Sequence, residues 1–86
     1  MVMTPDETLQ ILIVEDDEDI AIIYTRVLKN AGYKVVHAPD GELGYKLAIE
    51  ENPHLVLLDI MLPKKQGMEI LRELREHDRG KKLPIY

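Results

Sequence analysis

The sequence predicts an α/β domain built on an open parallel sheet with helices on both faces. Two short apolar runs, residues 9–14 and 55–58, are typical of buried strands, and a β-branched segment at residues 34–38 predicts a third strand. Segments with helical periodicity lie between and after these runs, so the predicted order is βαβαβα with short loops. Because crossovers between parallel strands are right-handed, this order gives a doubly wound parallel sheet.

The first helix is predicted to follow the first strand closely. Asp16 or Asp17 is expected to cap its start, and Lys29 followed by Gly32 marks its end. Its apolar residues recur at the i, i+3, i+4 spacing of one helical face, and they are Ile20, Ile23, Tyr24, Val27, Leu28 and Ala31.

Two further helices and two terminal segments complete the assignment. Residues 42–51 predict a second helix, which Gly44 weakens by about 1 kcal/mol relative to alanine if it lies in the interior. The third helix carries Met68, Ile70, Leu71 and Leu74. Residues 81–86 are expected to form a linker and the first residues of a fourth strand. Residues 1–8 are polar and without periodicity, which indicates an N-terminal tail before a domain at residues 9–86.

Composition limits the class of protein. With 86 residues the chain holds at most one small domain, and without cysteine it has neither disulfides nor thiolate metal sites. We see no signal peptide and no apolar run long enough for a membrane span, so we expect a soluble, cytoplasmic protein without a membrane partner. The net charge of −5 argues against a nucleic-acid partner and favours cations or a basic protein face.

Acidic residues follow the two most apolar strands. Glu15 and Asp16 come directly after the first strand, and Asp59 comes directly after the third. If these strands are neighbours, the three carboxylates meet at the carboxyl edge of the sheet, where their repulsion requires a proton or a cation. Magnesium prefers oxygen ligands, and beside it Asp59 can attack phosphorus. The simpler interpretation is that Asp16 and Asp17 only cap a helix and Asp59 only begins a turn.

These residues resemble the receiver domains of two-component response regulators. The resemblance rests on residues 11–17 (ILIVEDD), residues 40–42 (DGE) and residues 55–63 (LVLLDIMLP), with Gly67 eight positions after Asp59, and it spans almost everything from residue 9 to residue 86. It implies a flavodoxin-like fold with strand order 2-1-3-4-5. This chain would hold only the 2-1-3 part, with strands four and five missing or only begun.

The resemblance also implies roles for four residues. Asp59 corresponds to the phosphoacceptor, which takes a phosphoryl group from a histidine kinase or phosphotransfer domain. Asp16 corresponds to a direct ligand of Mg²⁺ (or Mn²⁺), Glu15 to an acid that holds the metal through water, and Met61 to a residue whose backbone carbonyl is a ligand. Such a domain is a signalling domain rather than an enzyme, with at most weak self-catalysed phosphotransfer and dephosphorylation.

The sequence also departs from the family. The Ser or Thr that ends strand four and the Lys that ends strand five in receiver domains are both missing, so phosphotransfer by this chain is expected to be impaired. The remaining basic candidates are better interpreted as surface or strand-end residues, and they are Lys64, Lys65, Lys81, Lys82, His37, His54 and His77.

Strand three would then lie at an edge of the sheet, which predicts self-association through that edge. Three alternatives stay open. The chain could be a non-catalytic half-domain that acts as a binding or assembly module. A phosphohydrolase is less favoured because Met61 stands where its second acid is expected. Nucleotide or flavin binding is disfavoured because no glycine-rich loop follows either apolar strand.

Overall fold

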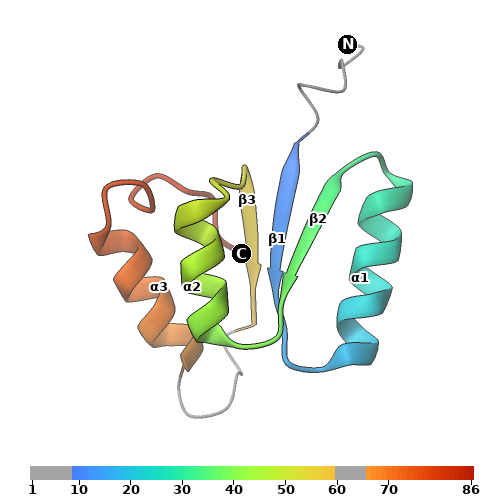
Figure 1. The fold of residues 1–86 in the computed structure, drawn as a ribbon, viewed down its shortest axis with the longest axis horizontal. Helices are drawn as coiled ribbons and strands as arrows, with labels where there is room; N and C mark the ends of the chain where they lie inside the picture. Colours follow the sequence, from blue (N-terminus) through green and yellow to red (C-terminus); the bar gives the residue numbers. More distant parts are fainter. Residues whose placement is uncertain (1–8, 60–65) are drawn as a thin grey trace.

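The computed structural model describes residues 9–59 and 66–86, in which three parallel strands alternate with three helices (Figure 1). The strand order is β2-β1-β3, which confirms the predicted 2-1-3 arrangement. The elements are β1 (Gln10–Val14), α1 (Glu18–Asn30), β2 (Lys34–Ala38), α2 (Gly41–Glu50), β3 (Leu55–Leu58) and α3 (Gln66–Glu76). No helix in the described part of the chain is both long and apolar enough to cross a bilayer.

The core lies between the sheet and the helix pair α2 and α3, which lie side by side in Figure 1. Alternate residues of each strand point to this side, because successive side chains of a strand face opposite sides of a sheet. The buried residues of this core are Leu12, Val14, Ala38, Ala48, Val56, Leu58, Ile70, Leu74 and Leu83. Gly44 permits the close approach of α2 to β1, because a Cβ at this position would lie 2.8 Å from Val14 Cγ2.

Helix α1 packs beside β2 on the opposite side of the sheet from α2. The helix is where the periodicity predicted it, but most of the predicted apolar stripe is not on the face it buries: Leu28 is half-buried and the other five stripe residues are exposed. Ala21 is buried and Thr25 and Leu28 are half-buried, whereas Ile23 and Val27 are 59% and 60% exposed. The stripe therefore remains an apolar surface among the described residues.

Both expected helix signals at α1 are present. The Asp17 carboxylate accepts a hydrogen bond from the Ile20 N–H at 3.1 Å, which identifies Asp17 rather than Asp16 as the cap. At the other end Gly32 adopts φ 98°, and the Tyr33 N–H donates to the Leu28 carbonyl at 3.1 Å. This is the Schellman arrangement, for which glycine is favoured because it has no Cβ.

The expectation of an unpaired strand-three edge is wrong for this structure. The N–H groups of Val56 and Leu58 donate to the carbonyls of Pro84 and Tyr86 at 2.9 and 2.7 Å, and Ile85 forms a parallel bridge with Val56. Pro84 is tolerated because it contributes its carbonyl and not the N–H that it lacks. The expected first residues of a fourth strand are therefore present.

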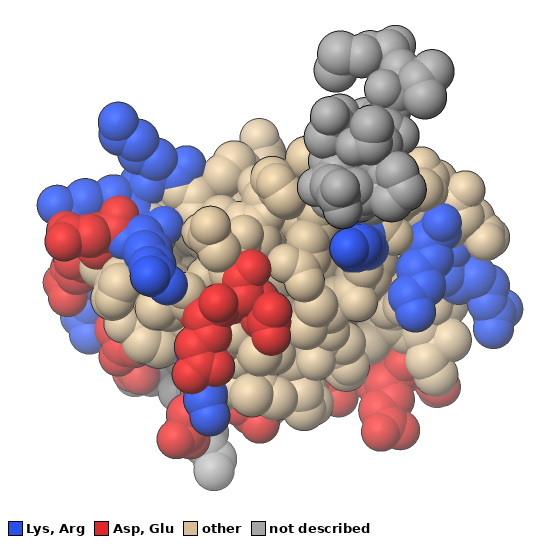
Figure 2. Space-filling view, turned by 45° about the horizontal axis from the view of Figure 1, so that its top comes forward, with Lys and Arg blue, Asp and Glu red and all other residues tan. Residues whose placement is uncertain are grey.

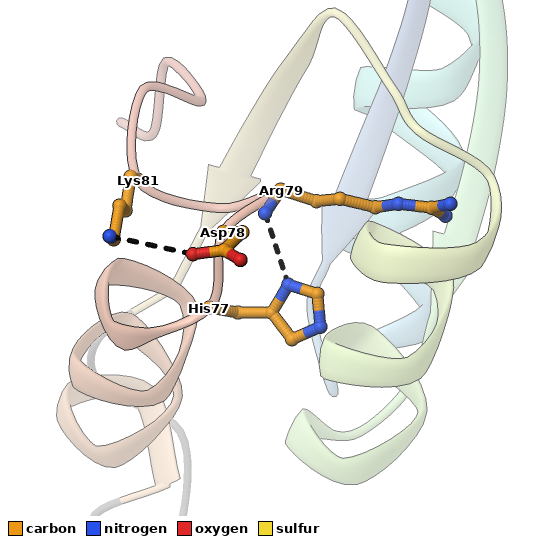
Figure 3. Close-up of polar contacts among 4 residues, drawn as sticks. All are labelled: His77, Asp78, Arg79 and Lys81. Carbon is orange, nitrogen blue, oxygen red and sulfur yellow. Dashed lines mark hydrogen bonds and ion pairs between the residues drawn. The ribbon is translucent and has the colours of Figure 1, made fainter.

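A compact turn after α3 directs this last segment to β3 (Figure 3). The Arg79 N–H donates to His77 Nδ1 at 3.1 Å, and Lys81 pairs with Asp78 at 3.4 Å. The Arg79 guanidinium reaches the Ile49 carbonyl of α2 at 3.1 Å. Arg75 donates to the carbonyls of Gly80, Lys81 and Leu83 at 3.0, 3.2 and 2.7 Å, so its charge holds the segment against α3.

Candidate functional site

The three strands end level with one another at the carboxyl edge of the sheet. Val14 is in register with Ala38 of β2 and Leu58 of β3, so the residues after these three positions emerge side by side. The strand order therefore brings the end of β1 directly beside the end of β3.

Three of the four predicted site residues meet there. One carboxylate oxygen each from Glu15, Asp16 and Asp59 lies within 4.8 Å of the others. Glu15 is buried, Asp59 is half-buried and Asp16 is exposed, so the cluster opens to solvent on the Asp16 side. Met61, the fourth predicted residue, lies outside the described residues.

Glu15 is the residue of the cluster whose charged form is disfavoured by its surroundings. Burial raises the pKa of its carboxyl, and the negative charges of Asp59 and Asp16 and a side-chain hydrogen bond with Asp59 raise this pKa further. The Asp17 N–H, which donates to Glu15 Oε1 at 3.2 Å, acts in the opposite direction. The site therefore favours either a proton on Glu15 or a cation among the three acids.

The donor set fits a hard divalent cation. Mg²⁺ binds oxygen at about 2.0–2.1 Å, so two oxygens on one ion lie at most about 4.2 Å apart. The three carboxylate oxygens lie within 4.8 Å of one another, which fits direct ligation by all three as well as a set in which one carboxylate acts through water. Asp17 is directed to the helix cap and is not part of the set.

The surrounding charge favours a cation at the same edge. Half of the sixteen acidic residues of the chain follow the strands here, five after β1, two after β2 and one after β3. In Figure 2 several acidic side chains lie along the lower rim of the molecule, which is the side where the strands end in Figure 1, and others lie at the centre of the face and at its left edge. Clustered charge of one sign raises the local concentration of oppositely charged ions.

The lysines and histidines that we interpret from the sequence as surface or strand-end residues mostly lie away from this edge. His54 Nδ1 accepts the Gln10 N–H at 2.9 Å at the start of the sheet, and the His77 ring meets Tyr45 edge to face. Lys81 pairs with exposed Asp78. Lys64 and Lys65 lie outside the described residues.

His37 is the exception, and sequence reasoning missed it. Its ring is half-buried, and its Nε2 lies 2.8 Å from the backbone carbonyl of Glu15. The sequence holds a signal, since His37 is the last residue of β2 to face away from the core and β1 pairs with β2 in parallel. This signal can be used only when the pairing register of β1 with β2 is known.

Comparisons with known proteins agree with this geometry. The family model described as the response regulator receiver domain matches residues 11–86. The chain is 43% identical over 67 residues to the alkaline phosphatase synthesis transcriptional regulatory protein PhoP of Bacillus subtilis, a match that covers 78% of this chain and 28% of that protein. It is 40% identical over 76 residues to the DNA-binding dual master transcriptional regulator RpaA of Synechocystis, covering 88% of this chain and 32% of that protein.

Solved structures give the same result. A putative response regulator of Chloroflexus aurantiacus matches with a TM-score of 0.85 at 33% identity, covering 91% of this chain and 64% of that one. The receiver domain of a sensor histidine kinase of Pseudomonas aeruginosa, solved with a magnesium ion in its active site cleft, matches with a TM-score of 0.85 at 29% identity and the same coverage. The chain thus spans about a third of these curated relatives and under two thirds of these solved chains. With its fold, its acidic cluster and these matches in agreement, the chain belongs to the response regulator receiver domain family.

Proposed function

We propose that residues 9–86 form a partial receiver domain of a cytoplasmic two-component system, in which Asp59 accepts a phosphoryl group from the phosphohistidine of a histidine kinase or phosphotransfer domain. The observation that carries this proposal is the convergence of Glu15, Asp16 and Asp59 at the carboxyl edge of the sheet. Asp59 is half-buried, so it is held by the fold while remaining accessible to a donor.

The reaction makes one bond and breaks one. An Asp59 carboxylate oxygen attacks phosphorus, the N–P bond of the phosphohistidine breaks, and the electron pair stays on the imidazole nitrogen. Asp16 would hold Mg²⁺ or Mn²⁺ directly, Glu15 through water and Met61 through its carbonyl. A bound cation supplies neutralisation of charge on the attacking oxygen and on the phosphoryl group. The same residues would support at most weak self-catalysed dephosphorylation.

The exposed stripe of α1 supports a protein as the donor. Ile20, Ile23 and Val27 are 39%, 59% and 60% exposed, and α1 begins two residues after Asp16. An apolar surface of this kind beside a reactive site is typical of a protein interface. A phosphohistidine protein that docks on α1 would bring its imidazole to the same edge as Asp59.

Phosphotransfer by the 86-residue chain should be slow. Receiver domains place a hydroxyl from strand four and a lysine from strand five around the phosphoryl group, and residues 9–59 and 66–86 show no strand that would carry either one. Loss of one preorganised donor typically costs about 10²–10³ in rate. Self-association through the β3 side remains a second proposal for the chain, now by opening or exchange of residues 83–86.

Mass spectrometry after incubation with a small phosphodonor tests the proposal. We expect slow, Mg²⁺-dependent addition of one phosphoryl group, absent from Asp59→Ala. Ile23→Lys should slow transfer from a phosphohistidine protein and leave labelling by the small donor unchanged. Labelling that persists in Asp59→Ala would refute the assignment, and rates equal to those of an intact receiver domain would refute the expected impairment. No labelling at all would favour the binding-module alternative.

A further inference from the structure

We propose that His37 is a positioning residue for the acidic cluster, which sets the metal affinity of the site by fixing the peptide group between Glu15 and Asp16. This inference rests on the proposed metal site and adds a residue to it. His37 Nε2 lies 2.8 Å from the Glu15 carbonyl oxygen, a distance at which an N–H donor makes a good hydrogen bond. A carbonyl only accepts, so Nε2 carries the proton.

The contact of His37 lies next to a second hydrogen bond between β2 and Glu15, and together the two fix the Glu15 backbone. The Glu15 N–H donates to the Ala38 carbonyl at 3.0 Å, and the Glu15 carbonyl accepts from His37. Two consecutive residues of β2 therefore hold the peptide groups on either side of the Glu15 Cα. Because peptide groups are planar, fixing both of them fixes the direction in which the Glu15 side chain leaves the backbone.

Asp16 lies between two parts of the chain that hydrogen bonds fix in place. On one side is the Glu15–Asp16 peptide, which His37 binds. On the other, the Asp17 N–H donates to Glu15 Oε1 and the Asp17 carboxylate caps α1. Without the His37 contact, the Glu15–Asp16 peptide group would no longer be fixed by a hydrogen bond to its carbonyl. Metal binding would then have to order the loop, and the loss of backbone conformational entropy would weaken it.

The environment of His37 makes the contact testable. The ring lines an open cleft of about 640 Å³ together with Ala21 and Thr25 of α1. A side chain of similar size can therefore replace histidine without a large rearrangement. His37→Phe keeps a ring and removes the donor, whereas His37→Gln keeps an N–H group at a similar reach. Val35→Ala is the matched control, because Val35 is half-buried on the same face of β2 and makes no such contact.

Titration with Mn²⁺ alone, followed by water-proton relaxation, measures the effect. We expect His37→Phe to weaken Mn²⁺ binding about threefold to tenfold, as for loss of one hydrogen bond, and His37→Gln to remain within about twofold of the parent. Val35→Ala should lower the unfolding temperature measured in EDTA and leave Mn²⁺ affinity within about twofold. This separation of affinity from stability is what a purely structural role would not produce.

Three results would overturn the role of His37 alone. His37→Phe could bind Mn²⁺ as tightly as the parent, or Val35→Ala could weaken binding as much as His37→Phe. The third is independent of folding of the variants: a long-range ¹H–¹⁵N spectrum of the parent in which neutral His37 carries its proton on Nδ1 would exclude donation by Nε2. A parent chain that binds no Mn²⁺ would overturn the metal site itself and His37 with it, whereas the first three results leave the metal site intact.

Discussion

Replacing Asp16 should separate metal binding from stability of the fold. A weak site with few charged ligands binds Mg²⁺ at roughly millimolar strength. At about 10 mM Mg²⁺ a site of this affinity adds about 1.4 kcal/mol to the free energy of unfolding. For a domain of this size such a change raises the unfolding temperature by about 5–10 °C. Asp16→Asn should abolish this increase, because it removes the charge of the exposed carboxylate of the cluster.

Without metal, Asp16→Asn should be slightly more stable than the parent chain. Glu15, Asp16 and Asp59 repel one another, and their proximity helps to raise the pKa of Glu15. Removing one charge relieves that repulsion, so Asp16→Asn should unfold at a slightly higher temperature than the parent in EDTA. Asp17→Asn is the matched control, since it makes the same charge change one residue away, and asparagine also caps helices well. It should retain the full Mg²⁺ effect.

The pH dependence follows from Glu15. Its pKa in the folded chain is above the ordinary value of 4.5, so folding favours the protonated form. The stability that Glu15 contributes is fully present below about pH 4.5 and is lost as the pH rises through the folded pKa. Protons and Mg²⁺ compete for the same carboxylates, so the Mg²⁺ effect should grow as the pH rises through this range.

Circular dichroism melting curves with and without Mg²⁺, at several pH values and constant ionic strength, measure all of these effects. An equal Mg²⁺ effect in Asp16→Asn and in the parent would refute the site. A Mg²⁺ effect that increases on acidification would refute the role given to Glu15.

Two further predictions concern the fold. Gly44→Ala should destabilise the chain despite the better helix propensity of alanine, which is worth about 1 kcal/mol, because the new Cβ meets Val14 at 2.8 and 2.9 Å and overpacking costs about 1–3 kcal/mol. Urea unfolding measures the loss, and Val14→Ala should tolerate alanine at position 44 better than the parent does; an additive double mutant would contradict the contact. Arg75→Met should release the segment at residues 80–83 and raise the average mass measured by light scattering after size-exclusion chromatography, because β3 would lose its cover. An unchanged mass at all concentrations would show that Arg75 does not protect that edge.

Local patterns predicted most of the architecture. The run before Glu15 and the run before Asp59 were long enough and apolar enough to identify strands, and the second strand agrees residue for residue at Lys34–Ala38. The pair Asp16 and Asp17 marked the start of α1 and Gly32 its end, because capping depends on residues adjacent in sequence; the choice of Asp17 needed the structure. Even the convergence of the acids followed from topology, since neighbouring parallel strands end at the same edge.

Contacts between distant residues were beyond the reach of pattern. Periodicity identified the apolar stripe of α1, but it did not predict that Ala21 would be buried and that Ile23 would remain exposed. The sequence also did not show that residues 84–86 cover β3, because this pairing uses the backbone carbonyls of Pro84 and Tyr86, which no side-chain pattern reveals. Gly44 was interpreted as a weakness of its helix, although its contact with Val14 explains why a larger residue is disfavoured.

The position of β1 between β2 and β3 explains why metal binding and phosphoryl transfer should respond differently in this chain. The three carboxylates follow β1 and β3, and the His37 side chain that contacts the Glu15 carbonyl lies on β2, so all of them are placed by the pairings of β1 with its two neighbours. These pairings are present in the described residues, so the acidic cluster can form fully. The groups that the family resemblance places around the transferring phosphoryl group lie on strands four and five, which are not among the strands of the described residues. We therefore expect this chain to bind Mn²⁺ but to accept a phosphoryl group slowly, and the two measurements test these expectations separately.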